Sequence, residues 1–183
     1  WPGGLAPLGY GDLHILTAID YGGDDLNKYI TAYFRKSFDV MDIEDITSLT
    51  LNLLRDDGAV VYLNGVEVAR SNLPEGEILY DTVSIYGVSE PEETTFLPFS
   101  IDSSLLVEGD NLLAVEVHQL SADSSDLGMD LELIGSRPAE TEPPSEEEEP
   151  EEEITEFPFI RVEVLPDYIP MLPEPCAPIY NQE

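Results

Sequence analysis

Between residues 13 and 134 the apolar side chains come in short, β-branched runs that Gly, Asp and Asn repeatedly interrupt. Runs of this length and spacing are typical of an antiparallel β-sandwich. No segment carries the apolar stripe of 3.6-residue period that a long helix needs to bury one face. The pattern therefore predicts an all-β fold. The candidate strands are residues 13–19, 30–40, 48–54, 59–63, 66–71, 78–85, 95–101, 111–120 and 127–134.

Two turns are especially clear in this pattern. The pair Asn64-Gly65 separates two apolar runs, and these residue types adopt the positive φ angles of a tight hairpin turn. The sequence Gly109-Asp110 precedes a strand whose alternate positions 113, 115 and 117 are apolar. Both features place antiparallel strands next to one another in the predicted sandwich.

The segment 56–68, DDGAVVYLNGVEV, and the segment 107–117, VEGDNLLAVEV, together resemble the galactose-binding-like jelly rolls. These include the sugar-binding domains of β-galactosidases and similar domains of secreted bacterial proteins. With residues 32–38 counted as an earlier strand, the resemblance covers about two thirds of the chain. It implies an antiparallel jelly-roll β-sandwich over residues 1–135. It leaves the function open, because this fold serves binding, structural and accessory domains alike.

The chain is strongly acidic, with 39 acidic against 7 basic side chains and a formal net charge of −32. Such a polyanion repels phosphate backbones and anionic lipids, which excludes nucleic acid and membrane surfaces as partners. No apolar run approaches the ~18 residues that a membrane span requires, so membrane insertion is also excluded. Together with the resemblance to secreted domains, these features predict an extracellular or cell-surface protein.

The sequence changes character after residue 135. Residues 136–156 form an acidic Pro/Glu-rich linker, too charged and too often interrupted by proline to bury a face. Within residues 157–183, Ile160, Val162 and Val164 alternate with charged residues, which predicts a half-buried strand. A Pro-rich tail of extended character follows it.

An isolated strand needs a sheet to pair with, either in its own sandwich or in another copy of the chain. An acidic, Pro-containing linker is stiff and extended, which favours another copy. Head-to-tail strand donation produces open filaments, so one hypothesis is a structural subunit of an extracellular filament that forms a homopolymer. The other is a carbohydrate-binding accessory module, stabilised by calcium, from a larger secreted protein. The proposed self-assembly residues are Phe157, Phe159, Ile160, Val162, Val164 and Leu165.

Acidic loops are the candidate metal sites. Carboxylate and carbonyl oxygens are the ligands that Ca²⁺ prefers, although Asp and Ser also build turns without any metal. The sequence Asp56-Asp57-Gly58 is interpreted as such a turn. The candidate Ca²⁺ ligands are Asp20, Asp24 and Asp25 in one loop and Asp123 and Asp126 in another.

No catalytic residue is assigned and the chain is predicted not to be an enzyme, since it lacks the motifs of nucleophilic and zinc hydrolases. The candidate glycan contacts are Trp1, His118 and Gln119, with His118 expected to face outward near a strand end. The single cysteine, Cys176, excludes an internal disulfide. It is either a thiol that links subunits or a reduced residue in a packed tail.

Overall fold

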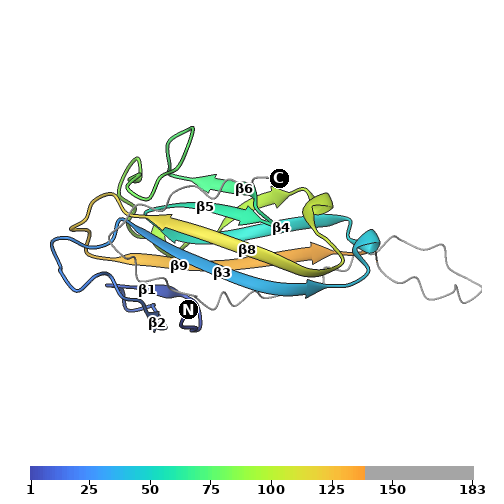
Figure 1. Cartoon of the computed structure of the whole chain (residues 1–183), viewed down its shortest axis with the longest axis horizontal. Helices are drawn as coiled ribbons and strands as arrows, with labels where there is room; N and C mark the ends of the chain where they lie inside the picture. The colour runs from blue at the N-terminus through green and yellow to red at the C-terminus, as the bar shows by residue number, and fades with distance from the viewer. Residues whose placement is uncertain (139–183) are drawn as a thin grey trace, which may run out of the picture.

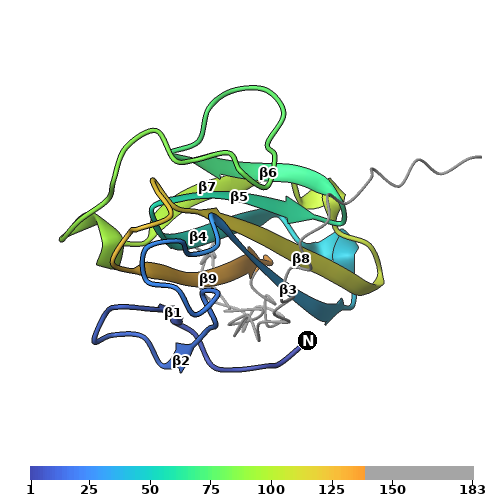
Figure 2. The ribbon, with the colours of Figure 1, turned by 60° about the vertical axis from the view of Figure 1, so that its left-hand side comes forward.

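The computed structural model of the protein describes residues 1–138, which form an all-β sandwich of two sheets (Figures 1 and 2). The five-stranded sheet has the order β2-β1-β9-β4-β7, and the four-stranded sheet has the order β3-β8-β5-β6. The strands of the first sheet are β1 (Leu8–Tyr10), β2 (Thr17–Ala18), β4 (Ser48–Asp56), β7 (Leu97–Ile101) and β9 (Leu127–Ser136). Those of the second are β3 (Thr31–Val40), β5 (Gly58–Leu63), β6 (Val66–Ser71) and β8 (Gly109–His118). Three 3-10 turns, η1 (Ile43–Asp45), η2 (Glu92–Thr94) and η3 (Ser103–Leu105), lie between strands of the described part.

The strand order is that of a jelly roll. Apart from the two-residue β2, which pairs with β1 in parallel, the strands form antiparallel pairs, and the chain crosses repeatedly between the sheets. Strand β9 pairs with both β1 and β4, while β8 pairs with both β3 and β5. The late strands β8 and β9 therefore lie inside sheets begun by early strands, which closes the sandwich. The predicted antiparallel jelly-roll sandwich is confirmed for the described residues.

The core lies between the sheets because alternate residues of each strand face inward. In β4 these are Leu49, Leu51 and Leu53, and in β8 they are Leu113, Val115 and Val117, all at most 3% exposed. The opposite faces of the same strands carry more polar residues. The alternating apolar residues in the sequence are thus the residues that are buried between the sheets.

The predicted Asn64-Gly65 hairpin is also confirmed. Both residues have positive φ, 51° and 83°, and they join β5 to β6. The Asn64 side chain fixes the turn, because its Oδ1 accepts the Leu112 N–H at 2.9 Å and its Nδ2 donates to Asn111 Oδ1 at 2.8 Å.

Two strand predictions are wrong. Residues 78–85 form turns and loop instead, since their backbone bonds to other loops: the Ser84 N–H donates to the Gln119 carbonyl and the Ile85 N–H to the Asn72 carbonyl, both at 3.1 Å. The expected strand 13–19 is mostly the loop between β1 and β2. Strand β9 ends at Ser136, one residue beyond the predicted domain boundary. Within residues 1–138, no helix is long and apolar enough to cross a membrane.

Candidate functional site

Three neighbouring strands of the five-stranded sheet bring together a group of acidic residues at one end of the sandwich. Strand β9 lies between β1 and β4, with Leu127 opposite Tyr10 and Gly128 opposite Asp56. The loop after β1 and the loop before β9 therefore meet beside the last residue of β4. The acidic site consists of Asp12, Asp56 and Asp126.

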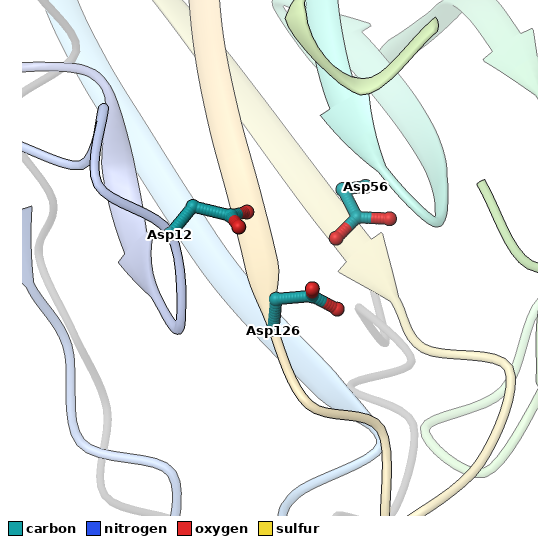
Figure 3. A group of neighbouring side chains, drawn as sticks. All are labelled: Asp12, Asp56 and Asp126. Atoms are coloured by element: carbon teal, nitrogen blue, oxygen red, sulfur yellow. The ribbon is translucent and has the colours of Figure 1, made fainter. Parts of the chain in front are cut away.

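The three carboxylates converge on one point (Figure 3). One carboxylate oxygen from each residue lies within 4.8 Å of the others. Gly11 makes the close approach possible. Its φ is +96°, and an added Cβ would lie 2.6 Å from Asp126 Cα, so a larger residue would separate the two loops.

The acidic site contains polar atoms that are buried without a hydrogen-bond partner. Asp56 is 2% exposed, and neither of its carboxylate oxygens accepts a hydrogen bond from any described residue. Three further buried atoms have no hydrogen-bond partner among the described residues: Asp12 Oδ2, His14 Nε2 and the Tyr10 hydroxyl oxygen. Buried polar groups in folded proteins are nearly always paired, so a cluster of unpaired ones indicates a missing partner.

Burial and mutual repulsion raise the pKa of these carboxyls. Burial raises the pKa of Asp56 to about 8, and the nearby carboxylates of Asp57 and Asp126 add to the effect. The pKa of Asp12 is also raised, first by burial and then by Asp126, although His14 partly opposes this. Burial and the charge of Asp12 raise the pKa of Glu93. The site therefore favours a bound positive charge, which is a proton on Asp56 when no cation is present.

The structure places the sequence-predicted metal ligands differently. Asp20, Asp24 and Asp25 are exposed, and each accepts a hydrogen bond within its own loop: from the Gly22 N–H at 2.8 Å, the Leu26 N–H at 3.0 Å and the Tyr21 hydroxyl at 2.9 Å, respectively. These are turn-building contacts, the alternative considered for such loops.

In the second predicted loop, Asp123 is exposed and accepts a hydrogen bond from the Ser121 hydroxyl at 2.6 Å. Asp126 alone of the five belongs to the acidic site. The sequence reasoning missed Asp12, and it interpreted Asp56 as part of a turn. No spacing between positions 12, 56 and 126 signals the site, because only the pairing of β1 and β4 with β9 brings them together.

A second surface of interest is the outer face of the four-stranded sheet. In one row of side chains, Tyr33 of β3 lies opposite Glu116 of β8. In the next row, Ala114 of β8 lies between Arg35 of β3 and Tyr62 of β5. These five residues, here called the sheet face, are half-buried or exposed.

The candidate glycan contacts lie at and beneath the edges of this face. Trp1 is 45% exposed, and its ring lies 4.1 Å from Arg35 Cζ at the β3 edge. His118 lies on the same face of β8 as Ala114 and Glu116, as expected, but it is not accessible. His118 is fully buried because residues of the 72–87 loop cover it, with its Nδ1 2.7 Å from the Thr82 carbonyl oxygen. Gln119 is also fully buried, and its Nε2 donates to the Tyr29 carbonyl.

Several sequence predictions fall outside the described residues. These are the linker 136–156 beyond residue 138, the self-assembly strand with Phe157, Phe159, Ile160, Val162, Val164 and Leu165, and the thiol of Cys176. The filament hypothesis depends on them and stays a prediction.

No family model and no curated protein matches the chain. Among solved structures, it is similar to part of an α-L-rhamnosidase from Streptomyces avermitilis, with 22% identity and a TM-score of 0.43 over 65% of this chain. It is similar to part of an α-L-rhamnosidase from Aspergillus terreus, with 17% identity and a TM-score of 0.43 over 62%. The β-D-mannosidase from Dictyoglomus thermophilum gives 22% identity and a TM-score of 0.32 over 48%. The matched regions are 10%, 13% and 9% of those enzymes' chains, so this chain corresponds to a small part of each.

Proposed function

We propose that the sandwich is a non-catalytic, carbohydrate-binding accessory module of a larger secreted protein, a galactose-binding-like jelly roll whose sheet face contacts the glycan. The observation that carries this proposal is the combination of two tyrosines with charged side chains on one accessible sheet surface. Sugars offer flat C–H surfaces that pack on aromatic rings, together with hydroxyls that hydrogen-bond to carboxylates and guanidinium groups.

The sheet face has the dimensions of an extended ligand. Tyr33 and Tyr62 lie two strands apart and one side-chain row apart, on either side of the small Ala114. With strands ~4.8 Å apart and ~3.3 Å per residue, their Cα atoms are roughly 12 Å apart. On the intervening strand β8, the small Ala114 lies beside Tyr62 and Glu116 lies beside Tyr33. A short oligosaccharide laid across β3, β8 and β5 would contact both rings.

Charged neighbours fix the hydrogen-bonding character of Tyr62. Burial, followed by the charges of Glu116 and Glu67, raises the pKa of Tyr62 to about 12. A side-chain hydrogen bond with Glu116 adds to this effect, so the Tyr62 hydroxyl and the Glu116 carboxylate form one polar pair on the sheet face. Glu67 is in turn oriented by Arg70, whose Nη2 lies 2.7 Å from Glu67 Oε2. Sugar hydroxyls would find both donors and acceptors here.

A glycan array with the full chain, followed by affinity electrophoresis on the polysaccharides that bind, tests this proposal. We expect Tyr62→Ala to weaken binding about tenfold or more, because it removes an aromatic surface and a donor together. Phe96→Ala is the matched control, since Phe96 is 42% exposed and precedes β7 in the other sheet. This control should retain binding. The absence of any glycan ligand, or equal loss in both variants, would overturn the proposal.

A further inference from the structure

We propose that Asp12, Asp56 and Asp126 hold a divalent cation of the size and hardness of Ca²⁺ at the end of the sandwich. This site is distinct from the sheet face and does not depend on the proposed glycan binding. Four features of the acidic site support the proposal: its geometry, its unpaired buried oxygens, its charge and the glycine that closes it.

The geometry fits a calcium-sized ion. Calcium–oxygen distances are about 2.3–2.6 Å, so two oxygens bound to one ion are separated by at most roughly 5 Å. The three carboxylate oxygens of the acidic site lie within 4.8 Å of one another. Three protein carboxylates favour calcium over magnesium, because Mg²⁺ demands near-ideal octahedral geometry and usually keeps several of its waters.

The burial of Asp56 is the second, independent sign of a ligand. An isolated carboxylate out of water is costly, and folded proteins pair it, protonate it or use it to coordinate a metal. Asp56 is 2% exposed, and neither oxygen accepts a hydrogen bond from the described part of the chain. Its side chain points toward Asp12 and Asp126 (Figure 3). A cation between the three residues would be the missing partner.

Within the described residues, the neighbouring Arg55 forms no hydrogen bond with the acidic site. The Arg55 guanidinium is committed elsewhere, with its Nε donating to Ser71 Oγ at 2.9 Å and its Nη2 2.5 Å from Glu92 Oε1. His14 lies at the edge of the site, where its Nε2 is 3.7 Å from the position of a Cβ added at Gly128. His14 Nε2 has no hydrogen-bond partner among the described residues, and imidazole nitrogens also coordinate metals, so His14 is a further candidate ligand.

The site also has a rigid frame. Asp56 ends β4 and Asp126 directly precedes β9, so both are positioned by the sheet register. Gly11 holds the loop that carries Asp12 against Asp126. Ligands that are held in place before binding lose little conformational entropy when the ion enters.

Calcium titration calorimetry on the chelator-treated full chain tests the proposal. Physiological ionic strength suppresses diffuse ion binding to so acidic a chain. We expect one equivalent of Ca²⁺ per chain, with Mg²⁺ binding more weakly. Asp126→Asn should weaken binding at least about tenfold, whereas Asp123→Asn, three residues away and exposed, should change it less than about twofold.

A second ligand variant guards against a folding defect. If circular dichroism shows that Asp126→Asn is unfolded, Asp12→Asn replaces it, since Asp12 lies on a loop and is only partly buried. Stoichiometric binding that both the Asp126→Asn and Asp12→Asn variants lose, and that Asp123→Asn keeps, supports the site. Binding of many weak equivalents, no binding at all, or equal affinity in a ligand variant and the control would overturn it.

Discussion

Asp56 and Asp57 are adjacent and almost fully buried, yet both oxygens of Asp57 accept backbone hydrogen bonds, whereas neither oxygen of Asp56 accepts one from the part of the chain that the structure describes. The Val88 N–H donates to Asp57 Oδ1 and the Leu120 N–H to Asp57 Oδ2, both at 2.7 Å. Asp57 thus fastens two loops to the end of β4, while Asp56 faces the acidic site. Asp57 has backbone partners, whereas Asp56 has no hydrogen-bond partner within residues 1–138.

Replacing Asp56 with asparagine should have opposite effects with and without calcium. In chelator at about pH 9, above the folded pKa of Asp56, Asp56→Asn removes a buried negative charge from an acidic cluster, so we expect stabilisation on the order of 2 kcal/mol, or roughly 5 °C in Tm. In calcium, the variant should lose the ligand-induced rise in Tm that the parent chain shows. Thermal unfolding of both proteins in both buffers measures this. If calcium raises the Tm of Asp56→Asn as much as it raises the Tm of the parent chain, the role assigned to Asp56 is contradicted.

The pH dependence of stability follows from the raised pKa of Asp56. Its pKa is about 8 in the folded chain, against about 3.9 for an unperturbed aspartate. Between these values the folded state binds a proton that the unfolded state has released, so the free energy of unfolding falls as the pH rises. In chelator, we therefore expect urea denaturation to show lower stability at pH 8 than at pH 5.

The Asp56→Asn variant separates this effect from the general repulsion of an acidic chain. In chelator, the free energy of unfolding of this variant should fall less steeply with rising pH than that of the parent protein. Saturating calcium should also make the free energy of unfolding of the parent protein less dependent on pH, because a bound cation favours the ionised form of its ligands. A stability that rises from pH 5 to pH 8 in chelator would show that Asp56 is ionised and paired in some other way.

Gly11 should be far less tolerant of alanine than a glycine of similar conformation elsewhere. Gly11 and Gly76 have φ of +96° and +93°, so alanine costs each position a similar backbone strain of about 1 kcal/mol. An added Cβ meets Asp126 at Gly11 and nothing within 4 Å at Gly76. Gly11→Ala should therefore cost about 2 kcal/mol more than Gly76→Ala in urea denaturation. Equal costs would mean that the Gly11 loop moves away freely.

The buried Asn111 should be a strong point of stability at the other end of the sandwich. It is 2% exposed, its Oδ1 accepts the Val107 N–H at 2.9 Å, and its Nδ2 donates to the Val107 and Gly109 carbonyls at 2.8 Å. Asn111→Ala removes the side-chain partner of these part-buried backbone groups, so we expect a loss of about 1–2 kcal/mol. Asn27→Ala, at an exposed position, should cost less than about 0.5 kcal/mol. Equilibrium unfolding of the two variants compares them.

The sequence predicts most of the fold because the strands of this sandwich have one buried face. The alternation at 113, 115 and 117 appears unchanged as the buried face of β8, and 66–71 is β6. Strand β1 was missed because it has three residues, all buried, with glycine at the centre. The segment 78–85 has β-branched residues but bonds to loops, so its composition indicated a strand that does not form.

The acidic site was largely beyond sequence reasoning for a different reason. Asp12, Asp56 and Asp126 each look like an ordinary turn residue in their local sequence. Their proximity arises from the placement of β9 between β1 and β4, a long-range pairing that no local pattern encodes. The exposed loop aspartates were the better calcium candidates by local composition, yet in the structure their side chains bond within their own loops.

The most direct test of the central claim is a crystal structure of the full chain grown in calcium, with anomalous difference density used to locate the ion. The account predicts one strong peak between Asp12, Asp56 and Asp126, with carboxylate oxygens at about 2.3–2.6 Å from it. A protonated Asp56 bonded to a neighbouring carboxylate, with no ion at this position, would contradict it. So would calcium bound only at the exposed loop of Asp20, Asp24 and Asp25.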